Sequence, residues 1–591
     1  MVVLDLLSQK YPRLAQYLLS NVRIDWLFHC YDQTRMERCL DIGSGLGGLV
    51  FPLAKFFKET ISLELDPVKI RFQKIRASQE HAENVATIRG DMLSLPFGSK
   101  QFDLVVLSGV LEWAASQHQS DPKSAQLRVL REAERCLKPG GCLYLGSENR
   151  YGLQYWLGAR DHTSLPYTGI LPRRIADAIV SRLLRAHGWT KYHTYTHTYS
   201  GYQRLLREAG FRTTAFYWTY PSYSYPKFAG KLCDGSSYAF LAQYHLSNYP
   251  YMRFYKRLYS FIMTILPLAI LANICLLFWP NYLVFAWKGP RSNTVEDVVA
   301  RATHARSLVR MSGRDAPCSR ISWVEMHGRK VKSFSKLSRC LKSNRLEQEE
   351  ILQQTHSGIG CERYSSGGLT FFREDAIRGR PYNLRDMLDA HRAVGWLLRF
   401  QKATASEPLA QTVIEKEKEW IRTALHGFES TNSALKYALK SIENLGALLV
   451  SASIPKCAEH GDFAPGNILF SDGKVVVIDW ELFRASGNPM FDACYFAITT
   501  AAIPRAGESF EKNLSGSGPY SALISSFARR FCHEKKLPLE AFRLGIPYAL
   551  IRCISRCSIY SDEPSPQVFE YAQLLKLWNA RIRHFDFSWL G

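Results

Sequence analysis

Residues 38–48, RCLDIGSGLGG, predict an apolar strand that ends in Asp41 and runs directly into a glycine-rich turn. Gly43, Gly45 and Gly47 stand at alternate positions of this turn. Glycine is needed where the backbone turns tightly and where a ligand must approach without meeting a Cβ atom. The pattern fits both a GxGxxG and a DxGxGxG turn. It therefore predicts a ligand-binding loop at a strand end without deciding between ligands.

Strand-like and helix-like segments alternate from residue 38 to residue 148. The expected strands are 38–43, 60–65, 84–89, 102–107 and 142–146. Between the first two strands, the apolar residues of LGGLVFPLAKFFKE (46–59) recur at helical spacing. Such alternation predicts a parallel α/β sheet.

Two carboxylates and one turn extend this pattern. Glu64 closes the second strand, where a carboxylate can accept hydrogen bonds from a ribose. Asp91 closes the third strand, where it can face an adenine edge. The segment LKPGG (137–141) predicts a tight turn into the fifth strand. These features favour a nucleoside-containing ligand.

These segments resemble the class I S-adenosylmethionine-dependent methyltransferases in order and spacing, over roughly residues 30–290. The likeness rests on LDIGSGLGG, LELD, GDMLSLPF, FDLVVLSGVLEW and LKPGG, and implies a seven-stranded Rossmann-like sheet with S-adenosylmethionine as cofactor. By this likeness, Asp41, Gly43, Gly45 and Gly47 would line the methionine and ribose side of the cofactor. Glu64 would hold the ribose hydroxyl groups, Asp91 and Met92 would contact the adenine, and Ser108 would lie beside the sulfonium. A Rossmann-type dehydrogenase and a domain that has lost binding are the alternatives.

The last two strands of the sheet are expected at 210–218 and 281–288, with an insertion at 224–280 between them. An insertion of this length calls for a purpose such as substrate docking or membrane contact. It contains FIMTILPLAILANICLLFW (261–279), which has no charge. We expect a buried or surface-lying hairpin here, because the final strand must rejoin the sheet. An interfacial membrane helix and a true span are the alternatives.

The residues after the fifth strand, ENRYGLQYWLGARDHTS (148–164), loosely resemble methyltransferases of surface-polysaccharide gene sets. Methyl transfer to a hydroxyl needs an in-line nucleophile and a group that takes its proton. His162, beside Asp161, is the predicted base, and a structural histidine is the equal alternative. The aromatic residues of 192–225 can stack on sugar rings or form core.

A second site is predicted by EHGDFAPGNIL (459–469) and VVIDWE (476–481). Phosphoryl transfer needs a carboxylate near the acceptor hydroxyl, and amide or carboxylate oxygens that hold Mg²⁺. Asp462 and Asn467, five residues apart in one loop, can each take one of these tasks. Asp479, at the end of a strand, offers a second metal ligand.

This motif resembles the catalytic loop of the aminoglycoside phosphotransferase and choline kinase group, HGDxxxxN followed by IDW or IDF. The resemblance implies a two-lobed, protein-kinase-like α+β domain that uses ATP and Mg²⁺. It assigns the catalytic base to Asp462, the magnesium ligands to Asn467 and Asp479, and the organisation of the loop to His460. Lys336 is the expected phosphate-pairing lysine, with Glu349 as its helix partner, although no clear glycine-rich loop precedes these strands.

Composition bounds the remaining choices. The 591 residues carry a formal net charge of +22, which favours anionic partners. Hydrophobic residues at 46% and charged residues at 22% exclude a mainly disordered or collagen-like chain. The 14 cysteines include no CxxC pair, so neither a disulfide framework nor a structural zinc is expected. We expect a methyltransferase domain at 1–290 and a kinase-like domain at 291–591, with lobes at about 300–380 and 381–591.

Two transferase motifs in one chain predict a bifunctional enzyme that modifies a cell-surface glycan or glycolipid precursor. The arrangement loosely resembles the methyltransferase–kinases that cap O-antigen chains. We expect a cytoplasmic location with peripheral membrane contact through 253–288, and no nucleic-acid or protein partner. The alternatives are tailoring of a soluble natural product, RNA modification, and a non-catalytic ligand-sensing scaffold.

Overall fold

A computed structural model describes the chain in two compact units. The first comprises residues 1–314, 320–337 and 364–371, and the second residues 315–319, 338–363 and 372–591. The residues that the structure describes are 18, 24, 36–115, 121–184, 194–244, 261, 265–291, 294–312, 321–328, 330–337, 355, 360–366, 369–377, 379–425, 433–503, 506–559 and 566–582.

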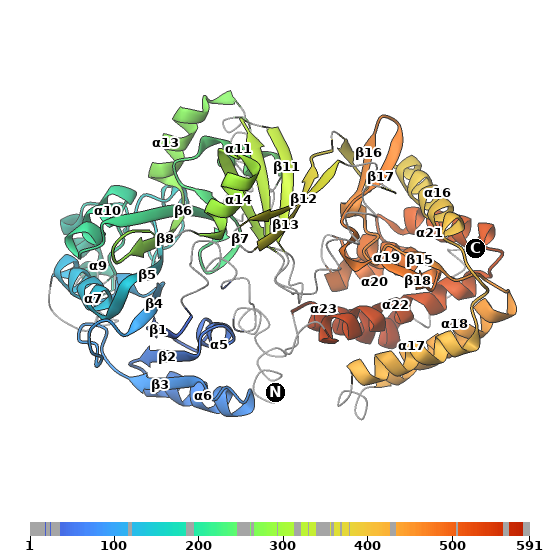
Figure 1. The fold of residues 1–591 in the computed structure, drawn as a ribbon, viewed down its shortest axis with the longest axis horizontal. Helices are drawn as coiled ribbons and strands as arrows, with labels where there is room; N and C mark the ends of the chain where they lie inside the picture. Colours follow the sequence, from blue (N-terminus) through green and yellow to red (C-terminus); the bar gives the residue numbers. More distant parts are fainter. Residues whose placement is uncertain are drawn as a thin grey trace. The chain divides into compact units, whose positions relative to one another are not determined.

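The first unit is built on a parallel sheet with the strand order β3-β2-β1-β4-β5 (Figure 1). Its strands are β1 (Arg38–Ile42), β2 (Glu59–Glu64), β3 (Val85–Arg89), β4 (Phe102–Ser108) and β5 (Leu137–Glu148). The helices between them are α5 (Val50–Ala54), α6 (Pro67–Gln79) and α7 (Pro122–Cys136), with the single turn η1 (Leu111–Trp113) after β4. The predicted α/β fold is confirmed. Residues 137–141, expected to form a turn, instead begin β5, whose register against β4 shifts between Phe102 and Leu104.

Two antiparallel strands complete the predicted order. β8 (Asn281–Trp287) lies between β5 and β6 (Thr213–Ser222) and pairs with both. All seven residues of β8 are buried, because neighbouring strands flank it and side chains cover both faces. The strand expected at 281–288 thus rejoins the sheet after the insertion, in the interior of the sheet.

Between β6 and β8 the described residues form the strand β7 (Tyr225–Lys231) and the helices α11 (Gly235–Tyr244) and α13 (Leu268–Phe278). Leu271 and Cys275 are the buried residues of α13, while Ile270, Ile274 and Leu277 are exposed. The buried side chain of Asn149 donates to the carbonyl oxygens of Leu277 (2.7 Å) and Trp279 (2.8 Å), which ties the end of α13 to the end of β5. None of the described helices is long and apolar enough to cross a membrane.

The sheet continues beyond β7 through further antiparallel strands. β9 pairs with β7, and β10 lies between β9 and β11. These strands are β9 (Ser307–Ser312), β10 (Ile321–His327) and β11 (Lys330–Leu337), with β13 (Leu369–Asp375) and β12 (Cys361–Ser366) at the edge. The other helices that the structure describes in this unit are α8 (Leu153–Trp156), α9 (Arg173–Leu183), α10 (Tyr199–Glu208) and α14 (Val295–Thr303). The sheet therefore has no break at residue 290, and the domain boundary predicted there stays a prediction.

The second unit is mainly helical. Its small sheets are β14-β16-β17, formed by Arg380–Pro381, Ile468–Ser471 and Lys474–Val477, and β15-β18, formed by Cys457–Glu459 and Arg484–Gly487. Its helices are α16 (Met387–Ala403), α17 (Gln411–Ala424), α18 (Ser433–Ser451), α19 (Met490–Ala501), α20 (Ala506–Leu514), α21 (Ser521–Glu534), α22 (Leu539–Ile559) and α23 (Pro566–Leu577), with the short turns η6 (Pro465–Asn467), η7 (Trp480–Leu482) and η8 (Trp578–Ile582). Nearly every residue of α19 is buried, so this helix forms the centre of the core.

Candidate functional site

The glycine-rich turn of the first unit follows β1. Gly43, Gly45 and Gly47 all have positive φ angles, of 67°, 60° and 78°. A Cβ atom at Gly43 would lie 2.1 Å from Val110 Cγ2, so only glycine fits there. A Cβ atom at Gly45 would meet nothing within 4 Å. The turn is therefore closely packed at Gly43 and open at Gly45.

The carboxylate of Glu64 holds this open part of the turn. Its Oε2 accepts a hydrogen bond from the backbone N–H of Gly45 at 2.8 Å. Its Oε1 accepts from the N–H groups of Leu65 (2.9 Å) and Asp66 (3.1 Å). Glu64 is buried, and these charge-assisted bonds fix the direction in which the turn leaves the sheet. Its predicted role on a ribose stays a prediction.

A second hydrogen-bond network, formed by side chains of β2 and α6, holds the same turn. Gln73 of α6 donates to Ser44 Oγ (2.9 Å) and to the carbonyl oxygen of Gly45 (2.7 Å). Ser62 of β2 donates to Gln73 Oε1 and lies within hydrogen-bond distance of Ser44 Oγ, each at 2.6 Å. The turn is thus held by both the strand and the helix that follow it, before any ligand binds.

The other predicted cofactor residues stand at the ends of neighbouring strands. Asp41 is buried in β1, and Ser108 is the last residue of β4 and half-buried. Asp91 follows β3 and accepts a hydrogen bond from the N–H of Leu93 at 2.9 Å, and Met92 beside it is half-buried. Because β1 to β4 are parallel, their carboxyl ends share one edge of the sheet. The structure therefore brings these residues to the edge that carries the turn.

His162 contacts a carboxylate that the sequence analysis did not single out. Its Nε2 lies 3.4 Å from Oε2 of Glu148, at the end of β5. This contact, which outweighs burial, raises the pKa of His162. Asp161 accepts hydrogen bonds from Thr163 and Thr168 and so organises its own loop. Glu148 could have been selected from its place at the end of β5, since functional side chains gather at strand ends in such sheets.

Tyr223 was also missed, because it belongs to the turn between β6 and β7, far along the chain. A Cβ atom at Gly109 would lie 2.7 Å from Tyr223 Oη, and one at Gly146 would lie 2.7 Å from Tyr223 Cδ2. The ring therefore packs on the two glycines beside Ser108. No local pattern marks such a contact.

In the second unit, the structure brings the predicted base and one predicted metal ligand together. The Asn467 side chain donates from Nδ2 to Oδ2 of Asp462 at 2.8 Å and to its backbone oxygen at 2.9 Å. Both bonds come from the amide nitrogen, so Asn467 Oδ1 points elsewhere and keeps its lone pairs. The loop thus fixes the Asp462 carboxylate and leaves the amide oxygen for another partner.

Asp479 follows β17 in a left-handed conformation, with φ 67° and ψ 66°. Such a conformation is costly for a residue other than glycine and is often found at functional sites. His460 links the two segments, since it accepts from the N–H of Asp462 (3.2 Å) through Nδ1 and contacts the oxygen of Ile478 (3.1 Å) through Nε2. The buried His460 therefore organises the loop, as expected from the motif.

Asp492 of α19 holds the backbone of the same loop from below. Its carboxylate accepts from the N–H groups of His460 (2.7 Å) and Gly461 (2.9 Å). Burial, helped by the charge of Glu459, raises the pKa of Asp492 to about 7. Gly461 has a φ of 83°, and a Cβ atom there would lie 2.1 Å from the oxygen of Leu482. The close approach requires glycine.

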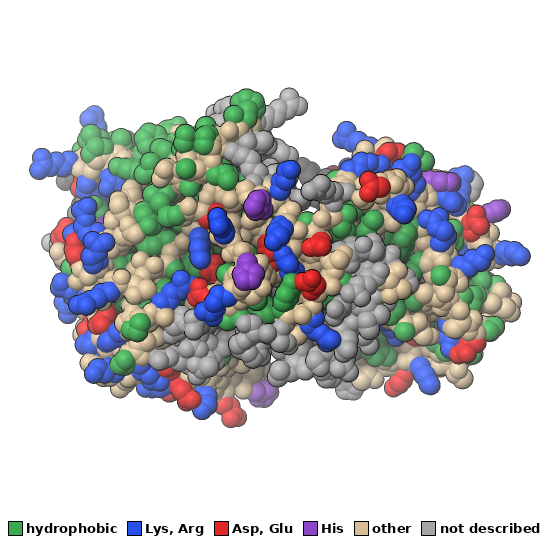
Figure 2. Space-filling view, turned by 45° about the horizontal axis from the view of Figure 1, so that its top comes forward, with side chains coloured by type: hydrophobic (Ala, Val, Ile, Leu, Met, Phe, Trp, Pro, Cys, Tyr) green, Lys and Arg blue, Asp and Glu red, His purple; other side chains and the backbone are tan. Residues whose placement is uncertain are grey.

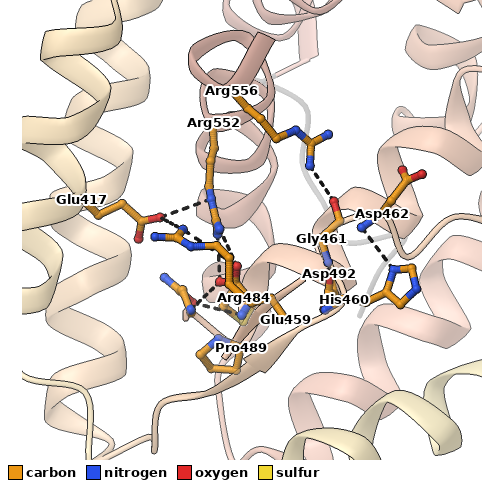
Figure 3. Close-up of polar contacts among 12 residues, drawn as sticks. Glu417, Glu459, His460, Gly461, Asp462, Arg484, Pro489, Asp492, Arg552 and Arg556 are labelled. Atoms are coloured by element: carbon orange, nitrogen blue, oxygen red, sulfur yellow. Dashed lines mark hydrogen bonds and ion pairs between the residues drawn. The ribbon is translucent and has the colours of Figure 1, made fainter. Parts of the chain in front are cut away.

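Two arginines of α22 complete this support (Figure 3). Arg552 forms a bidentate ion pair with the fully buried Glu459 and also contacts Glu417 at 3.3 Å. Arg556 donates to the backbone oxygen of Gly461 at 2.6 Å. Burial would raise the pKa of Glu459, but the charge of Arg552 outweighs it and holds that pKa below its usual value. Arg552 and Arg556 stand four residues apart in the largely apolar second half of α22, a spacing that the sequence analysis did not use.

A magnesium ion fits this loop in part. Asn467 Oδ1 and the Asp479 carboxylate offer two protein oxygens, and Mg²⁺ is commonly held by one or two such ligands together with substrate phosphates. Among the described residues there is no cluster of three or more His, Cys, Asp or Glu that could hold a metal by itself. The donor set thus suits an ion that arrives with a nucleotide.

The predicted nucleotide-pairing residues are only partly described. Lys336 lies in β11 opposite Ser322 of β10. Glu349 lies outside the described residues. Their pairing stays a prediction.

Comparisons with known proteins identify both parts of the chain. Residues 40–145 match the model described as "Methyltransferase domain", and residues 375–516 match that of the "Phosphotransferase enzyme family". The chain therefore joins a methyltransferase domain to a phosphotransferase-family domain, as predicted.

Two of the individual relatives are themselves described as methyltransferases. The chain is 32% identical over 90 residues to "Probable ribosomal RNA small subunit methyltransferase A" of Methanosphaera stadtmanae (15% of this chain, 32% of that protein). It is 27% identical over 141 residues to "Ubiquinone biosynthesis O-methyltransferase" of Xanthomonas oryzae pv. oryzae (24% and 54%). The chain thus spans about a third to about half the length of these curated relatives. The solved YcgJ protein of Bacillus subtilis is 15% identical with a TM-score of 0.25 (46% of this chain, 98% of that one).

The Arg552–Glu459 pair gives a stability prediction. Arg552→Met should lower the free energy of unfolding of the second unit by about 3–5 kcal/mol, because it removes the bidentate partner of the buried Glu459 and leaves only Arg484, at 3.9 Å, as a nearby positive charge. The double variant Glu459→Gln with Arg552→Met should recover part of this loss. Urea denaturation measures both effects.

The matched control is Arg543→Met on the same helix, since Arg543 pairs with Glu540 near the surface. A surface pair contributes about 0–1 kcal/mol. If Arg552→Met costs no more than Arg543→Met, the buried pair does not support the loop.

Proposed function

We propose that the chain is a bifunctional transferase that moves a methyl group from S-adenosylmethionine and a phosphoryl group from ATP to hydroxyl groups of an acceptor. The observation that carries the proposal is the presence of two separately organised loops. One is open at Gly45 and braced by Glu64. In the other, Asn467 donates to Asp462, and the backbone N–H of Ile478, next to Asp479, donates to the carbonyl oxygen of Asn467. The two family matches support the same pairing of activities.

In the first unit, the residues of the sheet edge would bind and orient the cofactor. The open space at Gly45 admits a ligand, and the Asp41 and Asp91 carboxyl groups stand at strand ends on either side of β2. S-adenosylmethionine supplies an activated methyl group when it is bound. The "Ubiquinone biosynthesis O-methyltransferase" match supports oxygen as the methylated atom.

In the second unit, Asp462 would accept the proton of the attacking hydroxyl. The hydrogen bond from Asn467 holds the carboxylate in one orientation, and this leaves Oδ1 of Asp462 for the acceptor. Asn467 Oδ1 and Asp479 would hold Mg²⁺, which neutralises phosphate charge when it is bound. Positioning supplies most of the catalysis in phosphoryl transfer, and the buried support under this loop fits that need.

The proposed acceptor is a cell-surface glycan or glycolipid precursor, and the proposed working place is a membrane surface. The net charge of +22 favours an anionic surface or acceptor. The exposed face of α13 presents Ile270, Ile274 and Leu277 to solvent, an unusual use of large apolar side chains. Hydrophobic side chains gather on the surface to which α13 contributes (Figure 2, upper left). The tests below also distinguish two alternatives, which are the modification of a soluble natural product and the sensing of ligands without turnover.

Cofactor binding tests the first activity. Gly45→Arg should abolish S-adenosylmethionine binding in calorimetry, because the side chain fills the open space over the turn. Gly45→Ala is the matched control, since it shares the unfavourable backbone conformation but leaves most of the space open. Tight binding of NADH, with none of S-adenosylmethionine, would overturn the assignment.

Phosphoryl transfer tests the second activity. Asp462→Asn should keep ATP binding but lower turnover on the order of 10²-fold or more, because the base is lost. The control is Asp472→Asn, which removes the same charge from an exposed position between β16 and β17. Wild-type turnover in Asp462→Asn would show that another group acts as base.

Membrane contact is tested with vesicles of phosphatidylcholine alone or mixed with phosphatidylglycerol. Ile270→Glu with Ile274→Glu should weaken flotation with the anionic vesicles, and salt should weaken it further, since a basic residue near such a surface contributes about 1 kcal/mol. The matched control is Val68→Glu with Ile75→Glu, which changes two exposed apolar residues of α6. A native protein that never floats at low salt would refute membrane contact.

A further inference from the structure

A cavity of about 210 Å³ opens beside the carboxyl end of β5. It is lined by Glu148, Gln154, Tyr155, Ala159, Arg160, Pro221, Ser222, Tyr223, Ser224, Pro280 and Asn281. Pockets for drug-sized ligands usually measure about 300–1,000 Å³. This cavity therefore has room for one ring-sized group.

The cavity adjoins the predicted place of the transferable methyl group. Tyr223, one of its walls, packs on Gly109 and Gly146 at the ends of β4 and β5. A Cβ atom at Gly146 would also lie 3.3 Å from Ser108 Oγ. Ser108 is the residue expected beside the sulfonium, so the cavity and the proposed cofactor site share the Tyr223 wall.

Glu148 is the only acidic residue among those that line the cavity, and its two described partners contact the same oxygen. Tyr155 Oη donates to Oε2, and His162 Nε2 lies 3.4 Å from Oε2. Oε1 accepts no hydrogen bond from any residue that the structure describes. One carboxylate oxygen is thus anchored, and the other is available to a molecule in the cavity.

We infer that Glu148 takes the proton of a hydroxyl group on a sugar-like ring bound in this cavity. The inference rests on the proposed methyl transfer. In that step the acceptor oxygen forms a bond to the methyl carbon, the carbon–sulfur bond breaks with its electron pair left on sulfur, and the hydroxyl proton moves to Glu148 Oε1. No further reactant is needed.

The lining indicates the class of acceptor. Gln154, Ser222, Ser224 and Asn281 bring amide and hydroxyl groups to the lining, and Tyr155 and Tyr223 bring aromatic rings. Several hydrogen-bonding groups around aromatic rings suit a ring with many hydroxyl groups better than an apolar ring. A single pyranose fits both this chemistry and the volume.

His162 becomes a positioning residue in this arrangement, because it stands behind Glu148 and is not part of the cavity wall. The charged or titratable groups around it are Glu148 of β5, the buried Glu112 of η1 and Asp161 of its own loop. Burial would raise the pKa of Glu148, but His162 and Tyr155 outweigh it and hold that pKa below its usual value. Glu148 thus stays ionised and able to take a proton.

Binding is measured first, on the full chain with S-adenosylhomocysteine present. The probes are methyl α-D-glucopyranoside, -mannopyranoside and -galactopyranoside, with cyclohexanol as a ring of the same size. Saturation-transfer NMR should detect at least one glycoside and not cyclohexanol. Ser224→Trp, which fills the cavity, should remove the signal. Binding of no glycoside, or binding unchanged in Ser224→Trp, would overturn the inference.

Methyl transfer to the best-bound glycoside is measured next, against pH. Glu148→Gln should lower the rate on the order of 10²-fold. His162→Gln should raise the pKa of Glu148, so that activity is lost at a higher pH as the solution is acidified, since only the ionised carboxylate takes a proton. Glu83→Gln, which removes an exposed charge on the same unit, should leave the profile unchanged.

The outcomes separate this inference from the proposed function. Failure to bind S-adenosylmethionine refutes the proposed function. Cofactor binding without transfer to any bound glycoside refutes the acceptor class, and a wild-type rate in Glu148→Gln refutes the role of Glu148. An unshifted profile in His162→Gln would show that His162 is merely structural.

Discussion

The antiparallel pairing of β8 between β5 and β6 is the constraint on which the first unit depends. The chain must return from a long excursion to the interior of a sheet, where seven consecutive residues become buried. The register places Glu148 opposite Asn281, so both become walls of one cavity. It also fixes the end of α13, through Asn149, beside the same strand end. A slip of one residue would turn every side chain of β8 to the other face.

In both units, a buried carboxylate accepts backbone N–H groups and so holds a glycine-containing loop. In the first unit Glu64 accepts the N–H of Gly45, and in the second Asp492 accepts the N–H of Gly461. A buried carboxylate that accepts backbone N–H groups fixes a loop more firmly than a neutral partner, because these hydrogen bonds are charge-assisted. In the second unit a buried ion pair, Arg552 with Glu459, lies at the start of the loop, since Glu459 directly precedes His460. Each loop is thus organised by the protein itself.

Hydrophobic periodicity predicted β1 to β4 to within about two residues, because a buried parallel strand is a local pattern. The sequence analysis expected the final strand to rejoin the sheet, but its place between β5 and β6 comes from the structure. The continuation of the sheet through β7 and β9 was not predicted, since pairing of antiparallel strands depends on long-range register. In the candidate site, the sequence analysis selected His162 for its residue type, but it did not select Glu148, which His162 contacts in the structure. Arg552 lies 93 residues beyond Glu459, a distance at which sequence spacing carries no information.

The central claim is that two transferase sites in one chain act on one acceptor. The most direct measurement is a single incubation of the full chain with methyl-¹⁴C S-adenosylmethionine, γ-³²P ATP and either membrane lipid extract or soluble extract. The account predicts one lipid-extractable product that carries both labels. Labels on two separate products, or on water-soluble products alone, would contradict it.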